Sequence, residues 1–222
     1  MGSEKFKRGH DYPGFFFTFE GGEGSGKSTQ IKQLAEYLEK QGKKVLVGRE
    51  PGGTPVGEQI RHTLQYYKQS HAMVPEAELL LFAASRVQLV REVIGPALNE
   101  EKIVLLDRYF DSTTAYQGAG RQLRKEDVEA INRFAIWNMR PDLTFLLDLD
   151  PKVGLERTRG RELFDRMEQQ SPDFFDRTRL EYLKLAKAEP HRFRVMDATK
   201  GIEDIQSTIR GYVDSFLRAY EK

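Results

Sequence analysis

Residues 19–29 read FEGGEGSGKST, the most informative stretch of this sequence. Gly21, Gly26, Lys27 and Ser28 fit the pattern G-x-x-x-x-G-K-[ST], a phosphate-binding loop that joins a strand to a helix. In such a loop the glycines let backbone N–H groups turn toward phosphate oxygens. The lysine reaches the β- and γ-phosphates, and the hydroxyl ligates Mg²⁺. The stretch therefore predicts a protein that binds a nucleoside triphosphate.

The rest of the chain alternates predicted strands and helices. Five short runs are almost continuously apolar, as expected of strands buried on both faces of a parallel sheet: 15–19, 44–48, 103–107, 143–149 and 192–197. Helical periodicity begins after the glycine loop and recurs in five later ranges: 75–99, 126–138, 151–160, 173–188 and 203–219. This order predicts an α/β, single-domain P-loop fold over residues 15–222, with a five-stranded parallel sheet flanked by helices on both faces.

Composition excludes several classes of protein. The 222 residues include 35 basic and 34 acidic side chains, so the net charge is +1 and no nucleic-acid partner is expected. Without cysteine the chain has neither disulfides nor thiolate metal sites. No apolar run approaches the roughly 20 residues that cross a bilayer, so no membrane association is expected. Residues 1–14 lack a signal peptide and are interpreted as a flexible leader, and a cytoplasmic location is expected.

Further motifs follow the glycine loop in a fixed order, and together they are specific. They are REPGGTPVGEQIR (49–61), LLLFAASRVQLV (79–90), DRYFDSTTAYQGAGR (107–121), RPDLTFLLDLDP (140–151) and RTRGRELFDRMEQQSPDFFDRTRLEYL (157–183). In this order the chain resembles the bacterial thymidylate kinase family over most of residues 15–200. The resemblance implies transfer of the γ-phosphoryl group of Mg-ATP to the 5′-phosphate of dTMP. It also implies a homodimer and a small mobile lid at about 157–172.

In that family ATP lies on the whole glycine loop. The resemblance therefore implies ATP contacts from Gly21, Gly22, Glu23, Gly24, Ser25, Gly26, Lys27, Ser28, Thr29 and Arg157. Asp107, at the end of the third predicted strand, is expected on the Mg²⁺ side together with Ser28. A helix or turn cap is the alternative role for Asp107.

The acceptor is itself an anion, so no strong general base is required. Two unit charges 4 Å apart repel by roughly 4 kcal/mol at an effective dielectric near 20, and cations should therefore converge between the phosphates. By resemblance Lys27 and Arg108 are catalytic, and Arg108 grips the acceptor phosphate. Arg49 assists it or instead forms an ion pair with Glu50.

The same resemblance assigns the remaining acceptor contacts. Phe82 would stack on the thymine, although its helical spacing alone equally suits a core residue. Arg86 shares a helix face with Phe82 and would reach a base carbonyl. The base edge would be read by Thr113 and Gln117, with Tyr116 near the sugar. Glu23 would point from the loop toward the 3′-hydroxyl, the alternative being an exposed loop carboxylate, and Glu20 would tie down the loop.

Some members of the family carry an arginine beside the loop carboxylate, where this chain has Gly24. The lid-arginine variety instead places its arginines near the predicted lid, and this chain has four there: Arg157, Arg159, Arg161 and Arg166. We expect Arg161 to be the catalytic transition-state cation, Arg157 to lie nearer the adenine, and Arg166 to pair with Asp165. The alternative for at least two of them is a solvated charged helix.

Two other functions remain open at this point. A deoxynucleoside kinase would use Glu50 as general base for a neutral 5′-hydroxyl. A non-catalytic P-loop protein would bind nucleotide and regulate a partner. The GGT after Glu50-Pro51, the DRY tripeptide at 107–109 and the lid arginines favour a phosphorylated acceptor over both.

Overall fold

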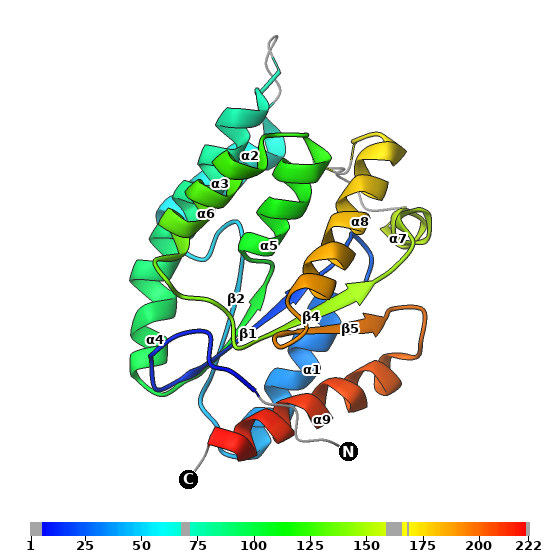
Figure 1. The fold of residues 1–222 in the computed structure, drawn as a ribbon. Helices are drawn as coiled ribbons and strands as arrows, with labels where there is room; N and C mark the ends of the chain where they lie inside the picture. The colour runs from blue at the N-terminus through cyan, green and yellow to red at the C-terminus, as the bar shows by residue number, and fades with distance from the viewer. Residues whose placement is uncertain (1–5, 68–71, 159–165, 168, 221–222) are drawn as a thin grey trace.

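The computed structural model of the chain describes residues 6–67, 72–158, 166, 167 and 169–220. It contains a five-stranded parallel sheet with the strand order β2-β3-β1-β4-β5 (Figure 1). The strands are β1 (Phe15–Glu20), β2 (Val45–Arg49), β3 (Ile103–Asp107), β4 (Leu143–Asp148) and β5 (Phe193–Asp197). Each lies within one residue of its predicted range at either end, and the predicted α/β class is confirmed.

Helices surround the sheet. Those in the described residues are α1 (Lys27–Lys40), α2 (Pro55–Tyr66), α3 (Pro75–Leu89), α4 (Gly95–Asn99), α5 (Phe110–Thr113), α6 (Lys125–Ile136), α7 (Pro151–Thr158), α8 (Pro172–Ala188) and α9 (Ile202–Tyr220), with π-helical turns η1 (Val90–Ile94) and η2 (Thr114–Gly120). The helix predicted over 75–99 is therefore one helical segment whose middle turn is π-helical. The sequence did not predict α2 or the helical segment from α5 to η2, which both border the cavity described below.

Alternate residues of the central strand supply the two faces of the sheet. Phe17 and Phe19 are fully buried among side chains of α1 and α9, whereas Phe16 packs on the opposite face with residues of η1 and α4. In Figure 1, α1 and α9 lie side by side on their face, and α3, α6 and α8 cover the other. Because both faces are covered, the strands read as nearly continuous apolar runs.

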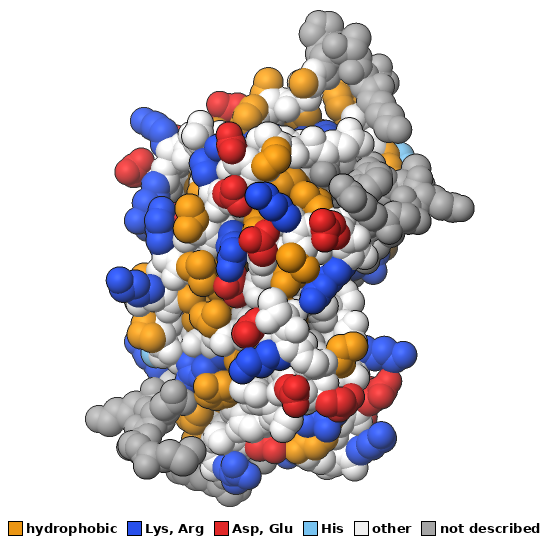
Figure 2. All heavy atoms as spheres, turned by 90° about the vertical axis from the view of Figure 1, so that its right-hand side faces the viewer, with side chains coloured by type: hydrophobic (Ala, Val, Ile, Leu, Met, Phe, Trp, Pro, Cys, Tyr) orange, Lys and Arg blue, Asp and Glu red, His pale blue; other side chains and the backbone are white. Residues whose placement is uncertain are grey.

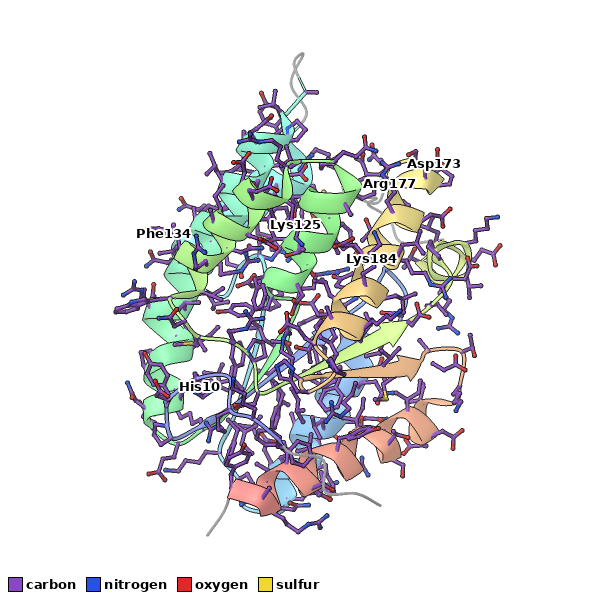
Figure 3. The ribbon with its side chains drawn as sticks, viewed as in Figure 1. His10, Lys125, Phe134, Asp173, Arg177 and Lys184 are labelled. Carbon is purple, nitrogen blue, oxygen red and sulfur yellow. The ribbon has the colours of Figure 1, made fainter. Side chains whose placement is uncertain are left out.

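Residues 6–14 run along the lower edge of the sheet and are fastened to it. Asp142, fully buried before β4, accepts bonds at 2.9 Å from Arg8 Nε and from the backbone N–H groups of Gly9 and Phe16. His10, labelled in Figure 3, is also buried in this segment. This part of the chain therefore differs from the flexible leader predicted over 1–14, because one carboxylate binds two of its donors together with an N–H of β1. Residues 1–5 lie outside the described residues.

The functional edge of the sheet is where the parallel strands end. Glu20, Arg49 and Asp107 are the last residues of β1, β2 and β3. The chain leaves the central β1 for β2 and β3 on one side and then crosses to β4 and β5 on the other, which makes this the topological switch point of the sheet. Open α/β sheets bind ligands in the crevice outside the carboxyl ends of their strands at such a point.

The outer surface carries both signs of charge. Figure 2 shows basic and acidic side chains interspersed over one face, in keeping with the near-zero net charge. Among the described helices, none is both long and apolar enough to span a bilayer.

Candidate active site

A cavity of about 460 Å³ opens at the carboxyl edge of the sheet. Its walls come from the glycine loop, the segment after β2, α2, α3, the end of β3 and η2. The lining residues are Glu23, Gly24, Ser25, Gly26, Lys27, Ser28, Thr29, Arg49, Glu50, Pro51, Arg61, Leu64, Gln65, Phe82, Asp107, Arg108, Ser112, Thr113, Tyr116, Gln117, Arg157 and Met167. Most residues predicted for both nucleotides thus border one space. Gly21 and Gly22 border a smaller cavity beside it.

The glycine loop has the backbone that its sequence requires. Gly21 and Gly26 have φ values of 135° and 92°, in a region that L side chains rarely adopt. Lys27, buried at the start of α1, curls over the loop and donates to the carbonyls of Gly21 at 3.0 Å and Gly22 at 2.9 Å. Burial lowers the pKa of Lys27, and the neighbouring charge of Arg108 lowers it further. A lysine held over inward-turning amides suits a polyphosphate anion.

Gly24 allows the loop to touch α7. Its φ is 66°, and a Cβ built there would lie 2.3 Å from the carbonyl oxygen of Gly154. A Cβ on Gly154 would in turn lie 2.2 Å from the carbonyl oxygen of Glu23. The backbones meet without side chains between them, so a side chain at position 24 would require the loop and α7 of this chain to move apart. This close backbone contact is the physical reason for a glycine at position 24.

Ser28 and Asp107 meet between the loop and the end of β3. The hydroxyl of Ser28 donates to Asp107 Oδ2 at 3.0 Å. The other carboxylate oxygen, Oδ1, is buried and has no hydrogen-bond partner in the described part of the chain. An orphaned buried carboxylate oxygen beside a hydroxyl is the donor set that a hard cation prefers, and Mg²⁺ typically takes one or two such protein ligands. These residues fit the predicted magnesium side of the site.

Arg108 lies near the lysine, since both side chains donate to the carbonyl of Gly21. Its Nη2 lies 2.5 Å from Glu23 Oε1, and its Nη1 donates to the carbonyl of Gly21 at 3.0 Å. The φ of Arg108 is 67°, the left-handed region, which costs a non-glycine residue roughly 1–3 kcal/mol. Its backbone N–H bonds to Phe19 of the central strand at 2.9 Å and holds that conformation. The carboxylate of Glu23 thus pairs with this arginine, and its charge also acts on Lys27.

The predicted base-side residues gather on one wall. Phe82 is half-buried on α3, facing the cavity together with Thr113, Tyr116 and Gln117 from α5 and η2. The amide nitrogen of Gln117 donates to Glu78 at 2.7 Å, so the amide oxygen is the end left to meet a ligand. A π-helical turn often marks a functional position, and η2 supplies two of these residues.

Arg86 is placed differently from the prediction of direct base contact. It is 1% exposed, and it lies behind the cavity wall. Its four hydrogen bonds go to Glu50 at 2.8 and 2.5 Å, Asn132 at 3.2 Å and Thr113 at 3.0 Å. These bonds use four of the five guanidinium N–H groups. In this arrangement Arg86 supports the wall and is neutralised by Glu50, whose Oε1 has no hydrogen-bond partner in the described residues. Its reach to a base carbonyl stays a prediction.

Arg49 borders the cavity, but its partner was not anticipated. Its guanidinium bonds both oxygens of Glu58 on α2 at 2.9 Å, and Glu50 is instead held by Arg86. The predicted alternative of an Arg49–Glu50 pair is therefore wrong. With a side chain 52% exposed, Arg49 keeps access to the cavity.

The predicted lid arginines are only partly within the described residues. Arg157 donates to the carbonyls of Gly24 at 3.4 Å and Ala198 at 3.1 Å. Arg166 pairs with Glu78 and donates to the carbonyl of Leu64 at 3.0 Å. Arg159, Arg161 and the expected partner Asp165 lie outside the described residues.

Sequence reasoning missed several cavity residues. Arg61 projects from α2 and donates to the carbonyl of Pro51 at 2.9 Å. It ends the motif at 49–61, which was recognised, yet without a predicted α2 nothing placed Arg61 at the site. Ser112 was likewise missed, since a serine two residues into a short helix carries no signal by itself.

Comparisons with known proteins agree on one family. A sequence model described as thymidylate kinase matches residues 19–209. Thymidylate kinases of Bifidobacterium longum subsp. infantis and Kosmotoga olearia are 46% and 45% identical, covering 92% and 93% of this chain and 88% and 97% of theirs. The crystal structure of thymidylate kinase from Ehrlichia chaffeensis superposes with a TM-score of 0.72 at 33% identity, covering 90% of this chain and 98% of that one.

Proposed function

The chain belongs to the thymidylate kinase family and phosphorylates dTMP with ATP. We propose the following roles for its residues in binding and catalysis. The observation that carries the proposal is that Lys27 and Arg108 both line one cavity and converge on the same carbonyl, that of Gly21. Donor and acceptor phosphates would meet at this pair of cations. Transfer then rests on positioning and charge neutralisation, because the acceptor oxygen is already anionic.

On the donor side, the triphosphate lies on the inward-turning amides of residues 21–29. Lys27 would exchange its bonds with the Gly21 and Gly22 carbonyls for phosphate oxygens. Arg157 would face the adenine, since it already reaches the backbone of Ala198, in the loop after β5.

We propose that Ser28 and Asp107 hold Mg²⁺, which fits the partnerless Oδ1 of Asp107. A metal ion held by these two residues would supply positive charge that offsets the charge of the donor phosphates. Ser28 fixes the carboxylate through its hydroxyl, and the buried end of β3 fixes the position of Asp107.

On the acceptor side, Arg108 would bind the 5′-phosphate with help from Arg49. Phe82 would stack on the base, Tyr116 would pack near the sugar, and Glu23 would accept the 3′-hydroxyl. Thr113 and Gln117 would read the base edge. The amide oxygen of Gln117 suits the N3–H of thymine, because Glu78 occupies its amide nitrogen.

The alternatives are not favoured. Arg86 holds Oε2 of Glu50 with two bonds, and Oε1 has no hydrogen-bond partner in the described residues, so it is the relatives, all thymidylate kinases, that weigh against Glu50 as a general base for a neutral hydroxyl. Turnover with dTMP, with thymidine and with no acceptor separates the candidates. We expect dTDP from the first and no product from thymidine. Thymidine phosphorylation would favour the deoxynucleoside kinase, and slow hydrolysis alone would favour a nucleotide-binding regulator.

We also propose that the protein acts in the cytoplasm as a homodimer. Support for association comes from exposed apolar side chains on neighbouring helices: Leu80 of α3 is 56% exposed and Phe134 of α6 is 78% exposed. Figure 3 shows Phe134 on the outer side of α6. Sedimentation of the wild type and Phe134→Glu tests this proposal, and a monomeric wild type would contradict it.

A further inference from the structure

Glu20 ends the central strand directly beneath the glycine loop and is fully buried. Within the described residues it forms no ion pair. Its Oε1 accepts the backbone N–H of Tyr109 at 2.8 Å. Its Oε2 lies 2.6 Å from the hydroxyl of Ser112 and 2.8 Å from that of Tyr182. A buried carboxyl with hydroxyl partners and no paired cation needs a physical explanation.

The three oxygens form a closed triangle, because the Ser112 and Tyr182 hydroxyls are themselves 2.7 Å apart. All three separations are typical of O–H···O hydrogen bonds. Each hydroxyl has a single hydrogen. With an ionised carboxylate, two hydrogens would have to serve three O···O contacts, and one contact would have no hydrogen between its oxygens. A third hydrogen on Oε2 completes the ring. The geometry therefore favours the neutral carboxylic acid.

The ring also touches the acceptor arginine. Nη1 of Arg108 approaches the Ser112 hydroxyl at 3.3 Å and the Tyr182 hydroxyl at 3.4 Å. In a closed ring each hydroxyl donates once and accepts once, and one lone pair remains for the arginine. Nη1 donates one of its two hydrogens to Gly21, so the two hydroxyls share the other as neutral acceptors, and Arg108 receives no second negative charge from this side.

We propose that Glu20, held as a neutral acid in a ring with Ser112 and Tyr182, is the positioning residue that orients Arg108 while leaving its charge available to the thymidylate phosphate. The inference rests on the proposed role of Arg108. Ionised Glu20 would place a carboxylate beside the arginine and compete with the incoming anion.

The surrounding charges agree with this role. Burial, and then the charge of Asp111, raise the pKa of Glu20 to about 7, opposed by Ser112, Arg108 and Tyr182. Lys27 and Tyr116 also feel its charge, and Glu23 lies on the far side of Arg108. Burial raises the pKa of both tyrosines, so neither titrates near neutrality.

The first test is the KM for dTMP between pH 7 and 9, where a phosphate with a second pKa near 6 stays doubly ionised. We expect the wild-type KM to rise by up to about tenfold as Glu20 ionises, with a smaller change in kcat. The KM of Glu20→Gln should stay flat. A flat wild-type profile, or an equal rise in Glu20→Gln, would overturn the inference. Glu129→Gln, an exposed change of equal charge on α6, should follow the wild type.

A second readout does not depend on activity. Difference infrared spectroscopy should show a protonated-carboxyl band at pH 6 that disappears by pH 8.5 in the wild type and is missing in Glu20→Gln. Its absence from the wild type at pH 6 would refute the neutral acid.

Should Glu20→Gln fail to fold, Ser112 provides another route. Ser112→Ala opens the ring and should raise the KM for dTMP about fivefold with kcat little changed, whereas Ser112→Thr keeps the hydroxyl and should preserve the KM. Equal KM values for the two variants would count against the ring. Failure of the proposed function is separately visible, because Arg108→Ala would then leave dTMP binding intact.

Discussion

Arg108 and Glu23 form an ion pair on the acceptor side of the cavity, with Nη2 of the arginine 2.5 Å from Oε1 of the glutamate. Both side chains are largely buried, at 16% and 26% exposed. The carboxylate in the glycine loop therefore pairs with a cation of the acceptor side, while its charge also acts on Lys27. A ligand with both a phosphate and a hydroxyl satisfies the two partners at once, since the phosphate takes the arginine and the hydroxyl takes the glutamate.

Arg108→Ala is expected to weaken dTMP binding by about two orders of magnitude, near 3 kcal/mol, because a charge-assisted contact to the acceptor phosphate is lost. ATP binding should remain largely intact. Calorimetric titration of each nucleotide measures both affinities. Arg124→Ala removes an exposed arginine on the surface and should change neither. Equal losses for both nucleotides would show that Arg108 serves the donor as well.

Glu23→Gln is expected to weaken discrimination for the 3′-hydroxyl. A carboxylate accepts a hydroxyl hydrogen about twice as strongly as a neutral oxygen does, so the preference for dTMP over its 3′-deoxy analogue should fall about tenfold. The kcat/KM ratio of the two nucleotides measures this preference. An unchanged ratio would place the hydroxyl away from Glu23.

Arg161→Ala is expected to lower kcat by more than tenfold while leaving the affinities for both nucleotides nearly unchanged, because its cation would act as charge redistributes during transfer. Single-turnover rates and equilibrium titrations separate these effects. Arg157→Ala should mainly weaken ATP. Unaltered turnover in Arg161→Ala would transfer the role to a neighbouring arginine.

The sequence predicted what local pattern determines. The glycine loop and the five buried strands can each be recognised from a dozen residues or fewer, because the pattern that specifies each of them lies within that short stretch. The sequence also contained a helix-start signal for α2 that was not used, a threonine followed by a proline. Thr54 caps α2 by accepting the N–H of Gly57 at 2.9 Å, and Pro55 is the first residue of the helix.

Long-range pairing was not predictable in the same way. The i, i+4 spacing placed Phe82 and Arg86 on one helix face, but burial of Arg86 depends on Glu50, which is distant in sequence. Asp142 fastens residues 6–14 through contacts more than a hundred residues apart. The local sequence does not predict the positive φ of Arg108 either, because tertiary contacts stabilise that backbone conformation.

The pKa of Glu20 links its proton to stability. The pKa is raised from 4.5 to about 7 by burial first, so the folded state holds the proton more tightly than the unfolded state. The free energy of unfolding should therefore fall as pH rises from about 4.5 to 7, by about 3 kcal/mol in total, and this contribution is constant above that window. The Glu20→Gln variant should not show this fall in the free energy of unfolding. Urea denaturation from pH 4.5 to 8.5 measures the free energy of unfolding of the wild type and of Glu20→Gln. The difference between the two should grow with pH and then level off, and the contributions of all other titrating groups cancel in it.

Gly154→Ala should disrupt nucleotide binding through backbone contact alone. Alanine favours a helix by roughly 1 kcal/mol over glycine, so α7 itself would gain. A Cβ at position 154, however, would lie 2.2 Å from the carbonyl oxygen of Glu23 and force the glycine loop to move. We expect ATP affinity to fall at least about tenfold, since misplaced amides no longer converge on phosphate. Gly211→Ala in α9 meets nothing within 4 Å and should leave ATP affinity unchanged while raising the melting temperature slightly. If both variants bind ATP like the wild type, contact between α7 and the loop does not fix the loop's shape.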